Sequence, residues 1–163
     1  MDEEQFDRFY TGSYTKLVGQ IYAMCGNLSE AQDCVQEAFI RAWDHRRKLD
    51  LSGHPEAWVR TTAYRLAVSR WRRARRAWRQ PDRALEPERD LEPSPDRVAI
   101  ATALAQLPED QRRAIVLYHL CDMSVAEVAD EVGSPTGTVK ARLSRGRAAL
   151  AALLDPDLEV RHA

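Results

Sequence analysis

The side chains best suited to chemistry lie between Thr138 and Arg147, in a segment that also has a regular apolar pattern. At about 100° per residue, Val139, Leu143 and Leu150 fall on one side of a helix, and small or basic residues lie around the rest of it. These candidates are Thr138, Lys140, Ala141, Arg142, Ser144, Arg145 and Arg147. Small side chains let a helix approach the floor of a DNA groove, where an arginine bonds a guanine edge. The pattern predicts DNA binding, with Arg145 at a base and Lys140, Arg142 and Arg147 at phosphates.

A second set of candidates combines arginines with aromatic rings, in the stretch WVRTTAYRLAVSRWRRARRAW from Trp58 to Trp78. Arginines grip phosphates and aromatic rings stack on unpaired bases, so this combination is typical of a nucleic-acid surface. The candidates are Trp58, Arg60, Tyr64, Arg65, Arg70, Trp71, Arg72, Arg73, Arg75 and Arg76. Tryptophan is more often a core residue in helical domains, so we expect about two of the four aromatic residues in this stretch to be structural. These four are Trp58, Tyr64, Trp71 and Trp78.

A third set is acidic and follows one side of an expected helix at 30–45. Asp33, Glu37 and Asp44 form the stripe, with Gln36 beside it and Ile40 in its midst. An apolar anchor among carboxylates is typical of a docking surface for a basic partner. An exposed isoleucine without consequence is also common, and the residues alone leave the two interpretations equal.

The charges are segregated along the chain although the net charge of the 163 residues is −1. Residues 60–79 contain 8 arginines and no acid, whereas residues 80–96 contain 6 acidic side chains, 2 basic ones and four prolines. A segment of the second kind predicts a flexible, extended linker. We therefore expect two small helical domains, 1–79 and 97–155, joined by the linker 80–96 and followed by a tail at 156–163.

The first domain is expected to consist of three helical segments. Residues 5–25 form the first, ended by Gly26-Asn27, and a capping box at Ser29–Gln32 opens the second at about 30–45. Its buried side is Ala31, Val35, Ala38, Phe39 and Ala42. Residues 46–54 are expected to be a polar loop, and Pro55 opens the third helix, with Val59, Ala63, Leu66 and Ala67 toward the core.

The second domain is expected to end in two helices joined by a tight turn. Its first helix has Val98, Ile100, Ala101, Leu104 and Leu107 at helical spacing, and the next restarts at Pro108 and carries Ile115, Val116 and Leu120. An apolar stripe at 125–132, a break at Gly133-Ser134-Pro135 and the helix with the first set of candidates then follow. This order predicts a helix-turn-helix, whose second helix enters the DNA major groove.

Several classes of protein are excluded by composition. No apolar run is long enough to cross a membrane, and the acidic N-terminal segment lacks the apolar core of a signal peptide, so we expect a cytoplasmic protein without membrane insertion. Cys25, Cys34 and Cys121 lack metal-ligand spacing and are expected to be buried thiols. No clustered carboxylates, nucleophile–base pair or glycine-rich phosphate loop is present, so we expect no metal, no cofactor and no enzyme.

Two stretches together resemble a known family. The segment AQDCVQEAFIRAW at 31–43 looks like region 2.2 of bacterial sigma factors, and LPEDQ at 107–111 with SPTGTVKARLSRGR at 134–147 looks like their region 4. Two helical domains and a linker, without a region 3 domain, are similar to the extracytoplasmic-function (ECF, group IV) type of the sigma-70 family. The resemblance covers residues 5–154.

The resemblance implies a promoter-specificity factor that binds core RNA polymerase and helps to open DNA. Asp33, Gln36, Glu37 and Ile40 would contact the clamp helices of the largest polymerase subunit, which favours docking for the acidic stripe. The 44–54 loop would hold a flipped −10 base, the Trp58–Arg76 segment would bind the −10 strand, and the first set of candidates would face the −35 element. A region 4 contact to the flap of the second-largest subunit and an anti-sigma partner are also implied.

The alternative is a repressor or activator that uses the helix-turn-helix alone, with residues 1–79 as a sensor or dimerisation domain. Such a regulator binds its operator without polymerase, commonly as a dimer on a two-fold site. It would have no use for the acidic stripe around Ile40.

The sequence departs from the family pattern in the −10 helix. It has Ala63-Tyr64-Arg65 and Ser69 where many family members have Ala-Arg-Asn and a later acid.

Overall fold

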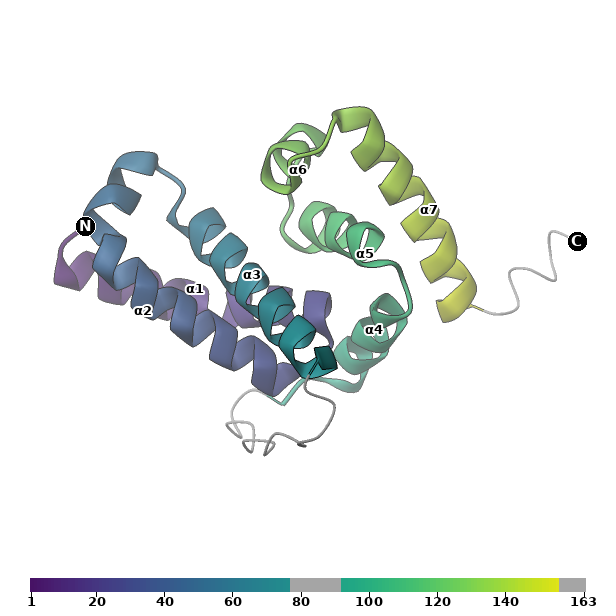
Figure 1. Ribbon diagram of the computed structural model, residues 1–163, viewed down its shortest axis with the longest axis horizontal. Coiled ribbons are helices and arrows are strands. Elements are labelled where there is room, and N and C mark those ends of the chain that lie inside the picture. The colour runs from purple at the N-terminus through teal and green to yellow at the C-terminus, as the bar shows by residue number, and fades with distance from the viewer. Residues whose placement is uncertain (77–91, 156–163) are drawn as a thin grey trace, which may run out of the picture. The chain divides into compact units, whose positions relative to one another are not determined.

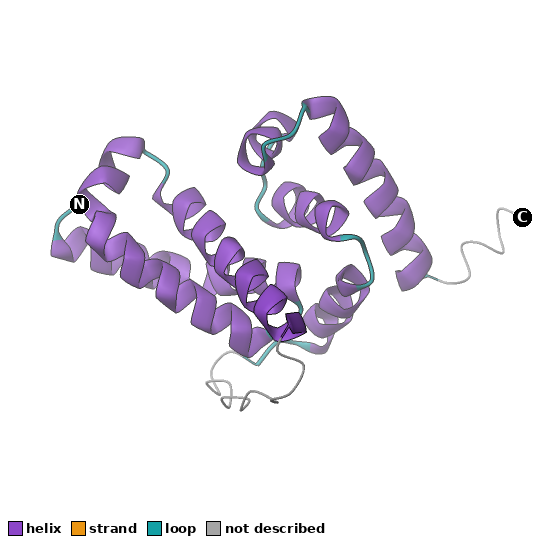
Figure 2. Ribbon diagram, in the orientation of Figure 1, coloured by secondary structure: helices purple, strands orange, loops and turns teal. Residues whose placement is uncertain are grey.

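A computed structural model describes residues 1–76 and 92–155, with the backbone alone for residues 50–52. The described residues form helices and contain no strand (Figures 1 and 2). The chain divides into two compact units, Met1–Glu92 and Pro93–Ala163. The all-helical fold expected from the sequence is confirmed. None of the described helices is long and apolar enough to cross a membrane.

The first unit contains three long helices, α1 (Glu3–Cys25), α2 (Leu28–Ser52) and α3 (Pro55–Arg76). Each packs against the other two, and Leu17, Ile21, Val35 and Val59 are fully buried between them. The predicted buried side of α2 is confirmed, because Ala31, Val35, Ala38, Phe39 and Ala42 are at most 2% exposed. The opposite side of α2 is therefore available to solvent.

Helix α2 begins and ends at residues other than those predicted. Asn27, in an extended conformation, caps it by accepting a hydrogen bond from the Glu30 N–H at 2.9 Å, so the predicted capping box at Ser29–Gln32 is wrong. The predicted loop at 46–54 is wrong as well, because the helix continues through it to Ser52. It ends where Gly53 adopts φ 70°, a left-handed conformation that suits glycine.

The second unit begins with α4 (Pro95–Ala105) and α5 (Glu109–Ile115). Helix α4 starts two residues before the expected position, since proline is tolerated in a first helical turn. Ala101, Leu104 and Leu107 are buried as predicted. Val98 and Ile100 are both 42% exposed, so their prediction as core residues is wrong. The buried residues within α4 are Ala101, Ala103 and Leu104, and both exposed residues precede them in the helix.

Helix α5 is extended by the π-helical turn η2 (Val116–Leu120), in which the Cys121 N–H donates to the Val116 carbonyl at 3.1 Å. Ile115 and Val116 are buried as predicted, whereas Leu120 is 47% exposed. The wider turn changes the angle between successive side chains, so that Leu120 leaves the buried side.

The predicted helix-turn-helix is present as α6 (Val125–Val132) and α7 (Thr136–Leu154). Ser124 and Glu127 form a capping box at the start of α6, and Gly133 ends it with φ 67°. Helix α7 packs on both α5 and α6. A Cβ added at Gly146 would lie 2.9 Å from Ile115 Cγ1, so glycine at this position permits the close approach of α5 and α7.

Candidate nucleic-acid and protein interfaces

Helix α7 presents most of the first set of candidates to solvent. Val139, Leu143 and Gly146 are buried against the rest of the unit. The side chains of Thr138, Lys140, Ser144, Arg145 and Arg147 are exposed, and Ala141 and Arg142 are half-buried. The structure thus brings these residues onto one helix whose small residues lie among its basic ones.

Arg142 is held by partners within the unit. Its Nε lies 3.3 Å from Asp110 Oδ2, and its Nη1 donates to Ser134 Oγ at 3.1 Å. Its guanidinium therefore ties α7 to α5 and to the turn before α7, which fixes the orientation of the helix. The sequence predicted a phosphate contact for Arg142 and gave no sign of these two partners, which are 32 and 8 residues away in the chain.

Arg147 also has internal partners. Its Nε donates to His119 Nε2 at 3.1 Å, and its guanidinium carbon lies 5.2 Å from the centre of the Tyr118 ring. Partial burial and the charge of Arg147 lower the pKa of His119, which favours the neutral imidazole that accepts this hydrogen bond. By contrast, Lys140 and Arg145 have no side-chain partner among the described residues.

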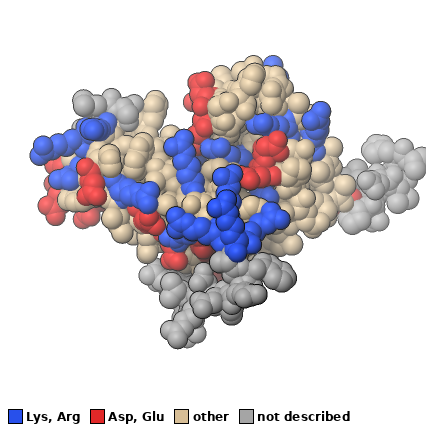
Figure 3. All heavy atoms as spheres, viewed as in Figure 1, with Lys and Arg blue, Asp and Glu red and all other residues tan. Residues whose placement is uncertain are grey.

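The C-terminal part of α3 carries the densest positive charge of the first unit. Trp71, Arg72, Arg73, Arg75 and Arg76 are all exposed, and Arg65 is exposed one and a half turns earlier. Trp71 is 55% exposed, and the Arg75 guanidinium lies 4.8 Å from the centre of its ring. Lys and Arg side chains gather over this end of α3 in the view of Figure 3. Exposed arginines beside an exposed indole ring suit a nucleic-acid strand.

Two of the residues predicted to contact DNA lie on the buried side of α3. Arg60 is 6% exposed and Tyr64 is 9% exposed, because both turn toward the side of α3 that carries Val59 and Ala63. Partial burial acts to raise the pKa of Glu56, one turn earlier, but hydrogen bonds from Lys16 and Ser13 outweigh it and the pKa is lowered, with a smaller contribution from the charge of Arg60. Trp58 is half-buried with its ring centre 5.7 Å from that of His45, and Trp78 lies outside the described residues.

The acidic stripe of α2 surrounds an exposed apolar residue, as the docking interpretation requires. Ile40 is 68% exposed, and Gln36 and Asp44 are exposed on either side of it along the helix. The side chains of Asp33 and Glu37 are 40% and 35% exposed. Asp33, Gln36, Glu37, Ile40 and Asp44 are called the docking surface below.

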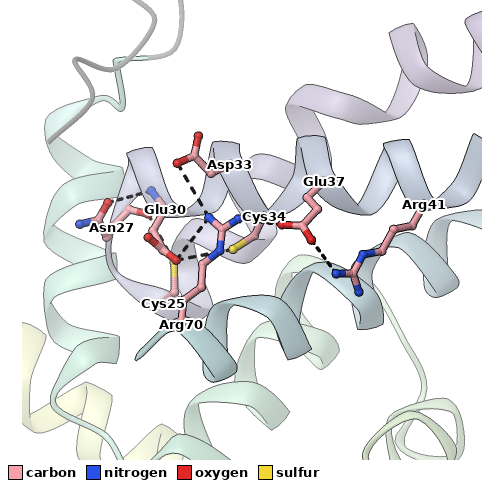
Figure 4. Close-up of polar contacts among 8 residues, drawn as sticks. All are labelled: Cys25, Asn27, Glu30, Asp33, Cys34, Glu37, Arg41 and Arg70. Atoms are coloured by element: carbon pink, nitrogen blue, oxygen red, sulfur yellow. Dashed lines mark hydrogen bonds and ion pairs between the residues drawn. The ribbon is translucent and has the colours of Figure 1, made fainter. Parts of the chain in front are cut away.

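Two carboxylates of the docking surface are bound by an arginine from the neighbouring helix. Arg70 points from α3 toward α2, where its Nη2 donates to Glu37 Oε2 at 2.8 Å (Figure 4). Its Nη1 lies 3.8 Å from Asp33 Oδ2 and 3.7 Å from Glu30 Oε1. The run of arginines predicts a DNA contact for Arg70, whereas the structure gives it three carboxylate partners.

Glu37 is also bound from its own helix, because Arg41 Nη2 donates to its Oε1 at 2.6 Å. Partial burial acts to raise the pKa of Glu37, but the hydrogen bonds from Arg70 and Arg41 outweigh it and the pKa is lowered. Sequence reasoning missed Glu30 and Arg41 as members of this cluster. Their spacing was a usable signal, since Glu30 lies three residues before Asp33 and Arg41 four residues after Glu37.

Both units match known protein families. The family described as Sigma-70 region 2 matches residues 9–77, and the family described as Sigma-70, region 4 matches residues 97–150. The ECF RNA polymerase sigma factor SigW of Bacillus subtilis is 31% identical, over 83% of this chain and 81% of its own length. The RNA polymerase sigma-H factor of Pseudomonas aeruginosa is 30% identical, over 95% of this chain and 89% of its own.

Two solved structures share the fold. The sigma factor RpoE of Bartonella quintana, in complex with the anti-sigma factor NepR, gives a TM-score of 0.76 at 26% identity and covers 94% of this chain and 99% of its own. CnrH, in complex with the cytosolic domain of CnrY, gives a TM-score of 0.69 at 25% identity and covers 96% of this chain and 91% of its own.

Proposed function

We propose a role in transcription initiation for each of the two units. The premise is that this chain belongs to the ECF group of the sigma-70 family of bacterial RNA polymerase sigma factors. The protein serves promoter-specific transcription initiation, and sigma factors are regulatory proteins that do this without catalysing the chemistry. The proposal concerns which surfaces bind core polymerase, which bind promoter DNA, and what regulates them.

The docking surface on α2 binds core polymerase, at the clamp helices of its largest subunit. The observation that carries this proposal is Ile40, a large apolar side chain that is 68% exposed among acidic and amide groups. In a protein interface such a residue is an anchor that loses its contact with water, while the surrounding charges steer a basic partner toward it. A DNA-binding repressor has no comparable need for this surface.

The C-terminal part of α3 binds the −10 element, with Arg65, Trp71, Arg72, Arg73, Arg75 and Arg76 as the contacting residues. Support comes from their common exposure and from the lack of acidic residues between positions 60 and 79. Arginines at this density repel one another unless an anion lies against them. Trp71 offers a ring on which an unpaired base can stack.

Helix α7 binds the −35 element through its exposed side. Arg145 and Lys140 are the groups proposed for base edges and nearby phosphates, with Thr138, Ala141 and Ser144 as small residues at the groove floor. Arg142 and Arg147 hold α7 in place through partners within the unit. Any contact that they make to DNA is to its phosphate backbone. The second unit also contacts the flap of the second-largest polymerase subunit.

An anti-sigma protein is proposed to regulate this factor in the cytoplasm. The two similar solved structures are described as a sigma factor with NepR and as CnrH with the cytosolic domain of CnrY. Each of those proteins is bound by a second chain, and this chain shares their fold over more than nine tenths of its length.

Run-off transcription on a promoter library, with core polymerase and the full chain, tests the proposal. We expect discrete transcripts only when core polymerase and this chain are both present, from promoters that share a −35 and a −10 element. Tight binding of the chain alone to a two-fold site, with no transcripts from the library, would instead support a repressor or activator.

A further inference from the structure

Arg70 differs from the arginines that follow it in where its charge is used. The side chains of residues 71–76 are all exposed, whereas that of Arg70 is 33% exposed and points back to α2. It contacts Glu37 at 2.8 Å, Glu30 at 3.7 Å and Asp33 at 3.8 Å (Figure 4). Its position in a run of arginines suggests DNA, but its contacts are all with the helix that carries the docking surface.

The three carboxylates share Arg70 as a cation. Glu30, Asp33 and Glu37 lie three and four residues apart, so they face the same side of α2 and repel one another. The Cys34 thiol lies beside them, but burial raises its pKa to about 12, so it carries no charge near neutral pH. The guanidinium of Arg70 therefore balances carboxylates and not a thiolate. It holds the Glu37 carboxylate by a hydrogen bond and lies within ion-pair distance of Asp33.

We propose that Arg70 is a positioning residue of the docking surface, acting through Glu37 and Asp33, and not a DNA contact. This inference rests on the proposed function, in which that surface binds core polymerase. Each carboxylate oxygen accepts more than one hydrogen bond, so Glu37 remains able to accept from a polymerase group while Arg70 and Arg41 hold it. A carboxylate fixed before the encounter loses less side-chain entropy on binding.

The same contacts couple the two binding surfaces of the first unit. Arg70 is the last residue of α3 before the exposed basic segment 71–76, and its ion pairs fix that point of α3 against α2. The exposed arginines that follow do not share these contacts with α2, so their own charge remains available to DNA. Loss of the Arg70 charge is expected to weaken polymerase binding first, and DNA binding only through it.

A double-mutant cycle on core-polymerase affinity tests this assignment. R70M is expected to weaken the equilibrium affinity of the full chain for core polymerase by about tenfold, which corresponds to ~1.4 kcal/mol. In the E37Q background the same change is expected to cost no more than about twofold, because Arg70 has lost its main partner. R8M, an exposed arginine of α1 paired with Glu4, is the matched control for loss of one positive charge and should leave the affinity unchanged.

A DNA measurement separates positioning from direct contact. Holoenzyme assembled with saturating R70M is expected to bind promoter DNA as the wild type does, with an unchanged slope of log affinity against log salt. R73M, three residues further along α3, should reduce the magnitude of that slope by about one, as the loss of a phosphate contact does. Circular dichroism of each variant verifies folding, and R70K, which retains the charge without the planar fork of donors, should fall between wild type and R70M.

These measurements distinguish failure of the proposed function from failure of the positioning role of Arg70. If wild type does not bind core polymerase, the proposed function is wrong. If wild type binds and R70M binds equally well, or loses the same factor with and without Glu37, the positioning role of Arg70 is wrong. A reduced salt slope for R70M, with unchanged polymerase affinity, would make Arg70 a DNA contact after all.

Discussion

At the scale of single residues, the basic side chains predicted to bind nucleic acid form two groups. One group has a partner within its own unit, and the other has none among the described residues. Arg70, Arg142 and Arg147 contact Glu37, Asp110 and His119, which are 33, 32 and 28 residues away in the chain. Lys140 and Arg145 have none among the described residues. The sequence placed all five in nucleic-acid surfaces because charge and spacing along one helix carry no information about a partner side chain on another. Burial of Arg60 was hidden for the same reason.

The pH dependence of stability follows from the pKa of Glu37. A carboxyl whose pKa is lowered by folding stabilises the folded state above its ordinary pKa of 4.5, and this contribution is lost as the pH falls through the lowered value. E37Q should therefore be less stable than wild type at neutral pH, by at most about 1 kcal/mol because the side chain is a third exposed. The difference should decrease below about pH 4, as thermal unfolding followed by circular dichroism at a series of pH values can measure.

The part of the Glu37 contribution to stability that depends on Arg70 can be measured in an R70M background. In the R70M background, the loss of stability caused by E37Q should be smaller at neutral pH, because only Arg41 remains to hydrogen-bond the carboxylate. A loss that stays constant from neutral pH to about pH 3, with Arg70 in place, would contradict the lowered pKa.

At the scale of helices, turns that need glycine were predictable and helix continuations were not. Gly26, Gly53 and Gly133 all adopt the left-handed conformation, with φ of 75°, 70° and 67°, and each ends a helix. Residues 46–52 were predicted as loop because they are polar, but Arg, Lys and Leu are good helix formers and polarity alone does not end a helix. The cap at Asn27 was missed because a serine two residues later offered an equally good motif.

The packing of α5 against α7 provides a test at the scale of helices. Gly146→Ala places a Cβ 2.9 Å from Ile115 Cγ1 and 3.2 Å from Ile115 Cδ1. Ile115 is only 3% exposed, so its side chain has little room to move away. Overpacking of this kind costs about 1–3 kcal/mol, which exceeds the ~1 kcal/mol that alanine gains over glycine within a helix. We expect a net loss in the free energy of unfolding, measured by urea denaturation of the full chain.

Gly137 offers the matched control in the same helix. A Cβ there meets no atom within 4 Å, so Gly137→Ala should be neutral or slightly stabilising. If both alanine variants were equally stable, the close approach at Gly146 would not restrict its side chain.

At the scale of the whole molecule, the family and the two helical units were predictable because they depend on motifs and on charge segregation. The sigma-factor resemblance of residues 31–43 and 107–147 is confirmed by the family matches. The internal ion pairs that organise each surface were not predictable, since they depend on how helices face one another. The assignment of each surface to polymerase, −10 or −35 stays a prediction.

That assignment predicts two different defects in transcription from a promoter library. D33N/E37Q removes charge from the docking surface, so it should reduce transcription from all promoters by a similar factor. The loss should be recovered at higher concentrations of the variant, because recruitment follows mass action. R145A removes a base contact, so it should cost ~1–3 kcal/mol at promoters that carry one particular −35 base pair and little at others.

Concentration separates the two mechanisms further. Saturating R145A cannot restore discrimination at the lost base pair, because the holoenzyme already contains the variant, and a pull-down with core polymerase should retain R145A as well as wild type. A promoter-selective defect in D33N/E37Q would place the acidic side of α2 near DNA instead of polymerase. An equal loss at every promoter in R145A would make Arg145 a phosphate contact and leave base discrimination to Lys140, which lies on the same exposed side of α7.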